Sequence, residues 1–395
     1  MKRIMTLIVV AFLFAQQILA QDVKKEELSF TRTVDLKATP VKDQYRAGTC
    51  WSYAGLAFLE SELIKMNKGE HDLSELFIVR MTYEEKGIKY VRMHGELNFG
   101  GGGAFHDVTN MIKKYGIVPE SVYKGLNYGT DNHVHGELDE VLKAYLDAVI
   151  KNKNKTLTTA WLPGYRAILD AYLGPIPEKF NYKGKEYTPQ SYAKELGLNM
   201  DDYICISSFT HHPFYAPFII EVPDNWAWDV VYNLPLNEMM QVMDHSLNNG
   251  FSIGWASDVS EKGFSFRNGV AIVPETDIKA MDGLERAKWE NMNSKDLEKE
   301  MFSFTKQVPE KVITQENRQL AFDNYETTDD HGMQITGIAT DQYGTKYYVV
   351  KNSWNTNNPY DGYFYASETF VKYKTMNIMV NKKSLPNEIL KKLKL

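Results

Sequence analysis

The stretch VKDQYRAGTCWSYAGLAFLE, residues 41–60, places a cysteine where a loop gives way to a helical pattern. From Thr49 onward the apolar residues fall on one broad helix face, so the sequence predicts a helix with Thr49 as its N-cap. Cys50 then lies in the first turn, where the positive end of the helix dipole lowers the pKa of a thiol. The only other cysteine is Cys205. Cys50 is therefore a buried thiol, half of a disulfide, or a nucleophile.

The composition is that of a globular protein with a substantial core. The chain has 395 residues, of which 43% are hydrophobic and 24% charged, and it contains 24 tyrosines. Its formal net charge is −6, and no basic block stands out before the terminal KKLKL. Composition and charge therefore argue against disorder and give no support for nucleic-acid binding.

The N-terminus has the features of an export signal. MKRIMTLIVVAFLFAQQILAQD begins with basic residues, continues with an apolar run too short to span a bilayer comfortably, and has Ala20 before Gln21. We expect a signal peptide over residues 1–20, a mature chain over 21–395, and a periplasmic or secreted location. The alternative is an N-terminal membrane anchor or a buried helix.

Helical patterns lie early in the chain and strand patterns late, which predicts the α+β class. Residues 40–130 are mainly helical, with Ser74 as a helix cap and Gly116 as a helix end. Residues 130–215 differ: one amphipathic helix is followed by loops marked by Pro and Gly, among them LPGY, and we interpret the segment as an inserted subdomain. Residues 216–380 are mainly strand, apart from a helix predicted over PLNEMMQVMDHSLNNG, and 381–395 form a lysine-rich tail.

A nucleophilic cysteine needs donors for an oxyanion and a base for its proton. Gln44, on the loop before Cys50, places a side-chain amide where it can assist the Cys50 backbone N–H. His331 begins one apolar strand pattern and Asn352 ends the next, with the turn DQYGT between them. An Asn side-chain carbonyl can accept from the far imidazole N–H and orient the ring. The adjacent Trp354 can screen that bond from water.

The motifs DQYRAGTCW, DHGMQITG and KNSW, in that order, resemble those of the papain-like cysteine peptidases. GGGAFHDVTNMIKKYGIVPESVY is similar to the bleomycin hydrolase / aminopeptidase C branch of that family. The resemblance spans about 40–130 and 235–370. It implies a papain-like two-lobed fold, with a helical lobe and an antiparallel β-barrel-like lobe.

The resemblance also implies roles for single residues, with every role-bearing position present. The expected catalytic set is Cys50 as nucleophile, His331 as base, Asn352 as orienting residue and Gln44 as oxyanion donor. The expected substrate-binding residues are Gly102 and Gly103, whose backbone would pair with the peptide, together with Trp354. Papain-like enzymes separate the Cys and His by roughly 130–150 residues; the longer spacing here fits the insertion.

The expected activity is hydrolysis of peptide bonds through an acyl-enzyme, in the form of an aminopeptidase acting on short peptides. In the resembled branch, a hexameric barrel and a C-terminal arm in the cleft restrict access, so a homo-oligomer is expected here too. The tail NKKSLPNEILKKLKL departs from the branch pattern and leaves endopeptidase activity open. Two further alternatives are a secreted binding protein on a degenerate peptidase fold and a cysteine-dependent acyl-transfer enzyme.

No metal or other cofactor is expected. HVH at 133–135 and HHP at 211–213 lack, in sequence, the carboxylate or cysteine neighbours that a zinc site needs. Cys205, within the apolar YICISSF, is expected to be a buried strand residue rather than a disulfide partner. Asp329 and Asp330 precede His331 and either raise its pKa or are solvated turn residues.

Overall fold

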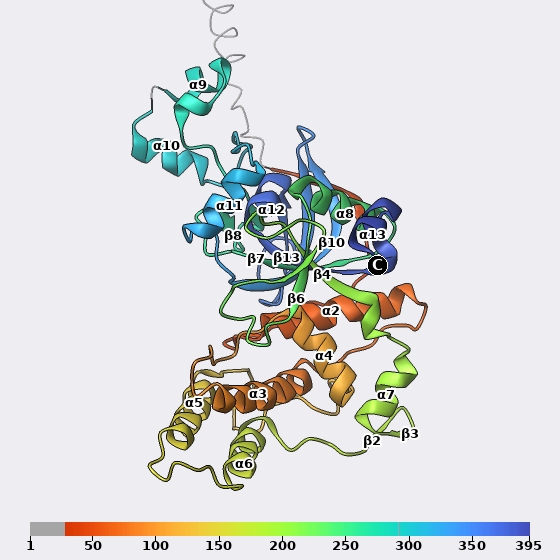
Figure 1. Cartoon of the computed structure of the whole chain (residues 1–395). Helices are drawn as coiled ribbons and strands as arrows, with labels where there is room; N and C mark the ends of the chain where they lie inside the picture. Colours follow the sequence, from red (N-terminus) through yellow and green to blue (C-terminus); the bar gives the residue numbers. More distant parts are fainter. Residues whose placement is uncertain (1–27, 291) are drawn as a thin grey trace, which may run out of the picture.

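Helix α2 (Cys50–Lys65) separates two lobes, one of helices and one built on a large sheet (Figure 1). The computed structural model describes residues 28–290 and 292–395, so the predicted signal peptide lies outside the described residues. Every residue of α2 from Trp51 to Leu63 is buried, because helices cover one side and strands the other. Thr49 takes the predicted N-cap position, but its backbone carbonyl, rather than its side chain, accepts from Ser52 N–H at 3.0 Å.

The helical lobe follows the local signals of the sequence closely. Its elements are α3 (Glu75–Arg92), α4 (Phe105–Tyr115), α5 (Gly136–Ile150), α6 (Trp161–Leu173), α7 (Pro189–Leu196) and a hairpin of β2 (Phe180–Tyr182) and β3 (Lys185–Tyr187). Ser74 caps α3 by accepting from Phe77 N–H at 3.0 Å, and Gly116 ends α4 with φ at +82°. The LPGY stretch, expected as a loop, instead lies in the first turn of α6. Pro163 is tolerated there because the first N–H groups of a helix have no intrahelical partner.

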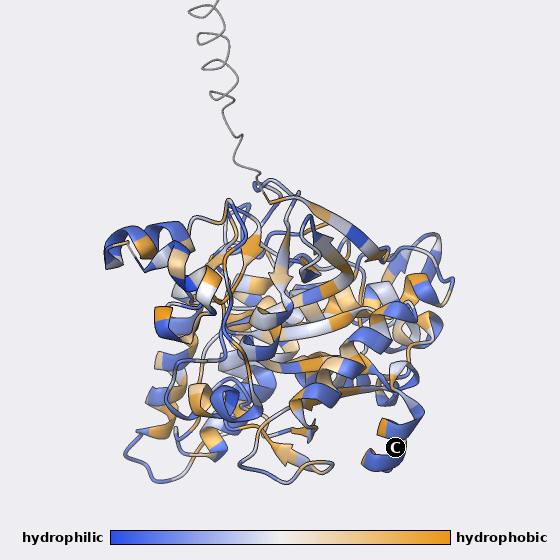
Figure 2. Cartoon of the chain, turned by 90° about the horizontal axis from the view of Figure 1, so that it is seen from above, coloured by the Kyte–Doolittle hydropathy of each residue, from blue (hydrophilic) through white to orange (hydrophobic). Residues whose placement is uncertain are grey.

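The β lobe is built on one sheet of eleven strands. Along the main path the order is β5-β6-β4-β13-β7-β10-β11-β12-β9-β8, and β1 pairs with β10. The strands are β1 (Phe30–Asp35), β4 (Tyr203–Ser207), β5 (Pro217–Ile219), β6 (Val230–Asn233), β7 (Ile253–Ser257), β8 (Phe264–Ser265), β9 (Val270–Ala271), β10 (His331–Asp341), β11 (Lys346–Lys351), β12 (Tyr363–Ser367) and β13 (Thr375–Asn381). The central strands are rich in hydrophobic residues, whereas the outer helices show many hydrophilic turns (Figure 2).

Helices interrupt the part of the chain that was expected to be mostly strand. They are α8 (Leu236–Asn248), α9 (Gly283–Trp289), α10 (Ser294–Met301), α11 (Gln315–Asp323) and α12 (Glu368–Lys374). Of these, only α8 was predicted. No helix in residues 28–290 and 292–395 is long and apolar enough to cross a membrane.

The predicted inserted subdomain contributes to both lobes. Helices α5 and α6 pack on α3, and α7 packs on α4. Strand β4, near the end of the same segment, lies inside the sheet between β6 and β13. Its Cys205 is buried and unbonded, as the apolar sequence around it predicts.

The C-terminal helix α13 (Asn387–Leu393) is docked on α8. Ile389 and Leu393 are buried in the core that includes α8, and the C-terminus lies beside these helices (Figure 1). Lys392 forms an ion pair with Glu238 at 2.7 Å. The lysine-rich tail is therefore held on the outer side of the β lobe.

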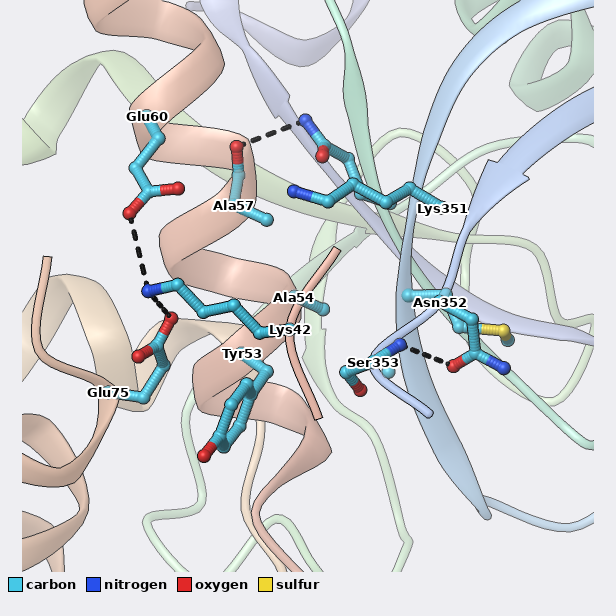
Figure 3. Close-up of a pocket in the computed structure, with 12 residues that line it drawn as sticks. Lys42, Tyr53, Ala54, Ala57, Glu60, Glu75, Lys351, Asn352 and Ser353 are labelled. Carbon is cyan, nitrogen blue, oxygen red and sulfur yellow. Dashed lines mark hydrogen bonds and ion pairs between the residues drawn. The ribbon is translucent and has the colours of Figure 1, made fainter. Parts of the chain in front are cut away.

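A buried cluster of charges ties the lobes together behind α2 (Figure 3). Lys42 Nζ lies 2.6 Å from Glu75 Oε1 and 3.8 Å from Glu60 Oε1. Glu60, in the middle of α2, also accepts from the Thr39 hydroxyl and from Leu73 N–H. Burial lowers the pKa of Lys42, but the charges of Glu75 and Glu60 outweigh that effect and leave it raised.

Lys351, the last residue of β11, belongs to the same cluster. Its Nζ donates to Thr39 Oγ1 at 3.1 Å, and burial lowers its pKa to about 8 although the charge of Glu60 opposes the shift. Glu60 thus supplies negative charge to lysines that arrive from both sides of α2. A buried cation that loses its counter-charge is strongly destabilising.

We predict that Glu60→Gln lowers the free energy of unfolding by about 3–5 kcal/mol, because it leaves buried lysines under-compensated. The matched control is Glu70→Gln, which breaks an exposed pair with Lys37 at 2.6 Å and should cost less than about 1 kcal/mol. Urea unfolding of the two variants measures the difference. Equal losses would contradict the assigned role of Glu60.

Candidate active site

Cys50 is the first residue of α2, and its thiol is free and partly accessible. The disulfide alternative is excluded, because Cys205 is also unbonded. Burial and the charges of Asp329 and Asp224 raise the pKa of the Cys50 thiol to about 12. The backbone N–H groups of Gly332 and Trp51 act in the opposite direction, because they favour the thiolate.

His331 is brought to Cys50 by a close approach between β10 and the start of α2. A side chain at Gly332 would place its Cβ 3.1 Å from Trp51 Cα and 3.4 Å from the Cys50 carbonyl carbon. Such contacts are tighter than ordinary packing, so a larger residue would require the helix and the strand to move apart by a few tenths of an ångström. Cys50 and His331 line one pocket as a result.

Asn352 orients the imidazole as the sequence predicts. Its Oδ1 lies 2.7 Å from His331 Nε2 and also accepts from Ser353 N–H at 2.8 Å. The Nε2 atom therefore carries the proton, which leaves Nδ1 as the ring nitrogen free to act as a base. Trp354 stacks on His331, with ring centroids 4.5 Å apart and an interplanar angle of 29°. That position suits screening of the His–Asn bond; a contact of Trp354 with substrate stays a prediction.

Gln44 is held next to the loop that precedes Cys50. Its Nε2 donates to Ala47 O at 2.7 Å, and its Oε1 accepts from the Ser353 hydroxyl at 2.6 Å. A primary amide has two N–H bonds, so one remains for an oxyanion. Ser353 was not singled out from the sequence, yet it contacts both Gln44 and Asn352. Its signal is its place inside KNSW, directly after Asn352.

The glycine loop forms the opposite wall of the pocket. Trp51 Nε1 donates to Gly101 O at 3.0 Å, and a Cβ at Gly103 would lie 2.8 Å from a Trp51 ring carbon. The loop is also fixed by Lys86, a buried residue of α3, whose Nζ donates to Gly102 O and, at 2.9 Å, to Gly100 O. No motif in the sequence singles out Lys86, which lies within an ordinary amphipathic helix pattern.

The pocket between these elements carries acidic groups beside the nucleophile. Among the residues that line it are Cys50, Gly103, Asp224, Asp329, His331 and Gly332. The sequence left Asp329 undecided and offered no reason to consider Asp224. Burial, together with the charges of Asp224 and Asp330, raises the pKa of Asp329 to about 7.

A second polar cluster lies away from this pocket. His211 Nε2 and His212 Nε2 lie 3.0 Å and 2.7 Å from the oxygens of Glu221, a carboxylate that the sequence did not place beside HHP. Gln319 Nε2 donates to His211 Nδ1 at 3.0 Å, while its Oε1 accepts from Thr210 N–H. The His211 proton is then on Nε2 and is donated to Glu221. Hydrogen bonds satisfy this cluster, and the absence of a metal stays a prediction.

Comparison with known proteins agrees with this geometry. A model described as the Peptidase C1-like family matches residues 8–298 and 283–395. The chain belongs to that family. Aminopeptidase C of Streptococcus thermophilus is 23% identical over 405 residues, which cover 92% of this chain and 84% of the relative. Bleomycin hydrolase of Rattus norvegicus is 22% identical over 414 residues, which cover 91% and 84%.

The solved structures place this Peptidase C1-like protein in the same fold. PepW from Lactobacillus rhamnosis HN001 matches with a TM-score of 0.70 at 22% identity, covering 92% of this chain and 84% of PepW. The predicted α+β, papain-like two-lobed fold is confirmed. The protein is a cysteine peptidase of the aminopeptidase C / bleomycin hydrolase branch.

In this peptidase the resting imidazole is neutral. Burial lowers the pKa of His331 to about 4, although the Asn352 hydrogen bond and the charge of Asp330 oppose the shift. The ordinary value is about 6.5. Between these two pH values the unfolded chain binds a proton that the folded protein does not. The contribution of His331 to stability is therefore complete above pH 6.5 and is lost as the pH falls toward 4.

We predict that His331→Gln flattens the pH dependence of the free energy of unfolding. At pH 5 the wild-type protein should lose about 2 kcal/mol through this residue, relative to pH 7.5, and the variant should not. Urea unfolding from pH 5 to 7.5 measures the difference. His133 and His135, whose pKa values burial lowers to about 4, are common to both proteins and cancel. Parallel pH curves would contradict the prediction.

Proposed function

We propose that this peptidase is an aminopeptidase in which Cys50, His331, Asn352 and Gln44 carry the chemistry. The observation that supports these roles best is the shared pocket of Cys50 and His331, together with the 2.7 Å contact from His331 Nε2 to Asn352. The contact with Asn352 fixes the tautomer of His331 and leaves the other imidazole nitrogen, Nδ1, free to act as the base. This is the arrangement that a thiol nucleophile and its base require.

In the proposed reaction the Cys50 sulfur bonds to the peptide carbonyl carbon while the thiol proton passes to His331. The resulting oxyanion is held by the Cys50 backbone N–H and the free N–H of Gln44. The carbon–nitrogen bond then breaks, and His331 donates its proton to the leaving amine. Water attacks the thioester, His331 takes one of its protons, and that proton returns to the sulfur as the acid leaves.

The neutral resting pair has a consequence for this reaction. Burial raises the pKa of the thiol and lowers that of His331, so burial favours the neutral form of each group in the free enzyme. We propose that transfer is coupled to attack, with the oxyanion donors stabilising the charge as it forms. The positive end of α2 contributes in the same direction.

The restriction to amino-terminal cleavage is supported by the names of the relatives, which include Aminopeptidase C and Aminopeptidase W. An endopeptidase with the same mechanism is the second candidate. A non-catalytic binding protein is disfavoured, because all four reactive positions are occupied by competent residues in one site. Peptide substrates follow from the family; no cofactor enters the reaction as written.

We predict that Cys50→Ser lowers kcat by about three orders of magnitude or more, as expected when a nucleophile is removed. An epoxide thiol probe should label the wild-type protein and not this variant. Cys205→Ala is the matched control, because it removes the only other thiol and should keep both activity and labelling. Full activity of Cys50→Ser without labelling of Cys50 in the wild type would refute the mechanism.

The aminopeptidase restriction is tested with peptides that differ only in acetylation of the N-terminus. We expect the free peptides to be cleaved and the acetylated ones to be poor substrates, because a blocked amine loses its charge. Mass spectrometry of the products shows which bond is cut. Equal cleavage of both sets would favour the endopeptidase.

Export and self-association complete the proposal. The basic and apolar N-terminus supports a signal peptide over residues 1–20 and a periplasmic or secreted location. The resemblance to the hexameric branch supports a homo-oligomer. N-terminal sequencing of protein from the periplasm or medium, expected to start at residue 21, tests the first point. Light scattering tests the second, and a monomeric mass would contradict it.

A further inference from the structure

The pocket beside Cys50 has an anionic wall that the proposed reaction does not use. Asp224 and Asp329 both line it, and their charges reach Cys50, where they raise the pKa of the thiol. Negative charge next to a thiol opposes formation of the thiolate, so it works against the nucleophile. Its presence at this point calls for a ligand that carries positive charge.

Asp224 is placed by the loop 220–229, which connects β5 to β6 and lies over the glycine loop. A Cβ at Gly102 would be 2.1 Å from Asp224 Oδ2, so the carboxylate rests directly on that glycine. Asn98 Nδ2 donates to Oδ1 at 3.1 Å, which fixes the group and leaves Oδ2 for another donor. The carboxylate therefore covers the wall where an extended substrate would continue past Gly103.

The loop 220–229 is anchored to the helical lobe by the residues that follow Asp224. Trp226 Nε1 donates to Asp107 Oδ2 at 3.0 Å, and Lys89 Nζ donates to Ala227 O at 2.9 Å. Asn225 holds the loop together by donating to Asp229 O at 3.0 Å. Asp224 is thus carried by a braced segment that packs against the glycine loop.

Asp329 faces the same space from the β lobe, two residues before His331. Within the described part of the chain, neither Asp329 nor Asp224 forms an ion pair. Burial raises the pKa of Asp224, and the nearby charge of Lys86 opposes that shift, but the Lys86 Nζ is occupied by the carbonyls of the glycine loop. A cation between the two carboxylates would relieve their mutual repulsion.

We propose that Asp224 and Asp329 form the subsite that holds the α-ammonium group of the substrate. This inference rests on the proposed aminopeptidase function. Asp224 lies over Gly102, and both carboxylates line the pocket of Cys50, where they can pair with the positive charge at the amino end of a peptide. The C-terminal residues 382–395 pack outside this pocket, so these side chains supply the anionic groups.

The test compares kcat/KM for consumption of the coumarylamides of Ala, Ala-Ala, acetyl-Ala-Ala and acetyl-Lys-Ala, followed by mass spectrometry because an aminopeptidase cuts the Ala-Ala substrate first between its two alanines. The enzymes are the wild type, Asp224→Asn and Asp329→Asn, with Asp229→Asn as control. Asp229 lies in the same loop and undergoes the same change, but its carboxylate accepts from Asn110 at 2.8 Å, away from the pocket.

We expect each of the first two variants to reduce the preference for free over acetylated Ala-Ala by about tenfold or more, as for a lost charge-assisted contact. Asp229→Asn should leave the preference unchanged. The preference is the decisive quantity, because a change in thiol pKa alone alters cleavage of both substrates alike. Asparagine keeps the shape of the side chain, and variants that retain activity on acetyl-Ala-Ala are thereby shown to be folded.

The other outcomes are separable. If the wild type prefers free amines and both variants keep that preference within about twofold, the ammonium subsite is refuted and the aminopeptidase stands. If the wild type cleaves both forms equally, the aminopeptidase proposal fails. Selective loss of acetyl-Lys-Ala cleavage in the variants would show that the carboxylates bind a basic side chain, which overturns the α-ammonium assignment.

Discussion

The structure depends on the close contact between β10 and the first turn of α2, where Gly332 leaves room for the backbone of Cys50 and Trp51. This contact puts His331 into the same pocket as Cys50, although the two come from different lobes. It also brings the Gly332 N–H to the thiol. A Cβ at this point would push the strand away from the helix. The separation of nucleophile and base is thus set by backbone packing, and the side chains only complete it.

Two polar systems hold this contact in place from opposite sides. Behind α2, the charge of Glu60 stabilises Lys42, which follows Thr39, and Lys351 at the end of β11 (Figure 3). In front, Ser353 joins the Gln44 loop to Asn352, so the oxyanion donor and the imidazole share one support. Buried polar groups are costly unless they are satisfied, so both systems favour one arrangement of the lobes. The same contacts that dock the two lobes therefore also set the geometry of the site.

The electrostatics of the pocket favour a neutral enzyme and a charged ligand. Burial favours the uncharged forms of the imidazole and the thiol, and acidic residues line the same pocket. The aminopeptidase and the ammonium subsite proposed above share one physical basis, the placement of Asp224 by a loop that both lobes hold. The C-terminal helix, fixed on α8, takes no part in this wall. The preference for substrates with a free amino terminus would then come from Asp224 and Asp329 inside the pocket rather than from the C-terminal helix.

Local chemistry in the sequence was enough to predict the start of α2, the Ser74 cap, the Gly116 helix end, the strands that carry His331 and Asn352, and the buried state of Cys205. Each depends on residues near one another in the chain, and the order of the motifs was enough to indicate the family. The loop predicted for LPGY was wrong, because a proline is compatible with both a loop and the first turn of a helix. It could not reveal Asp224, Lys86 or the link from Ser353 to Gln44. Those contacts join segments far apart in the chain, and only the packing of the two lobes against α2 decides which distant side chains meet.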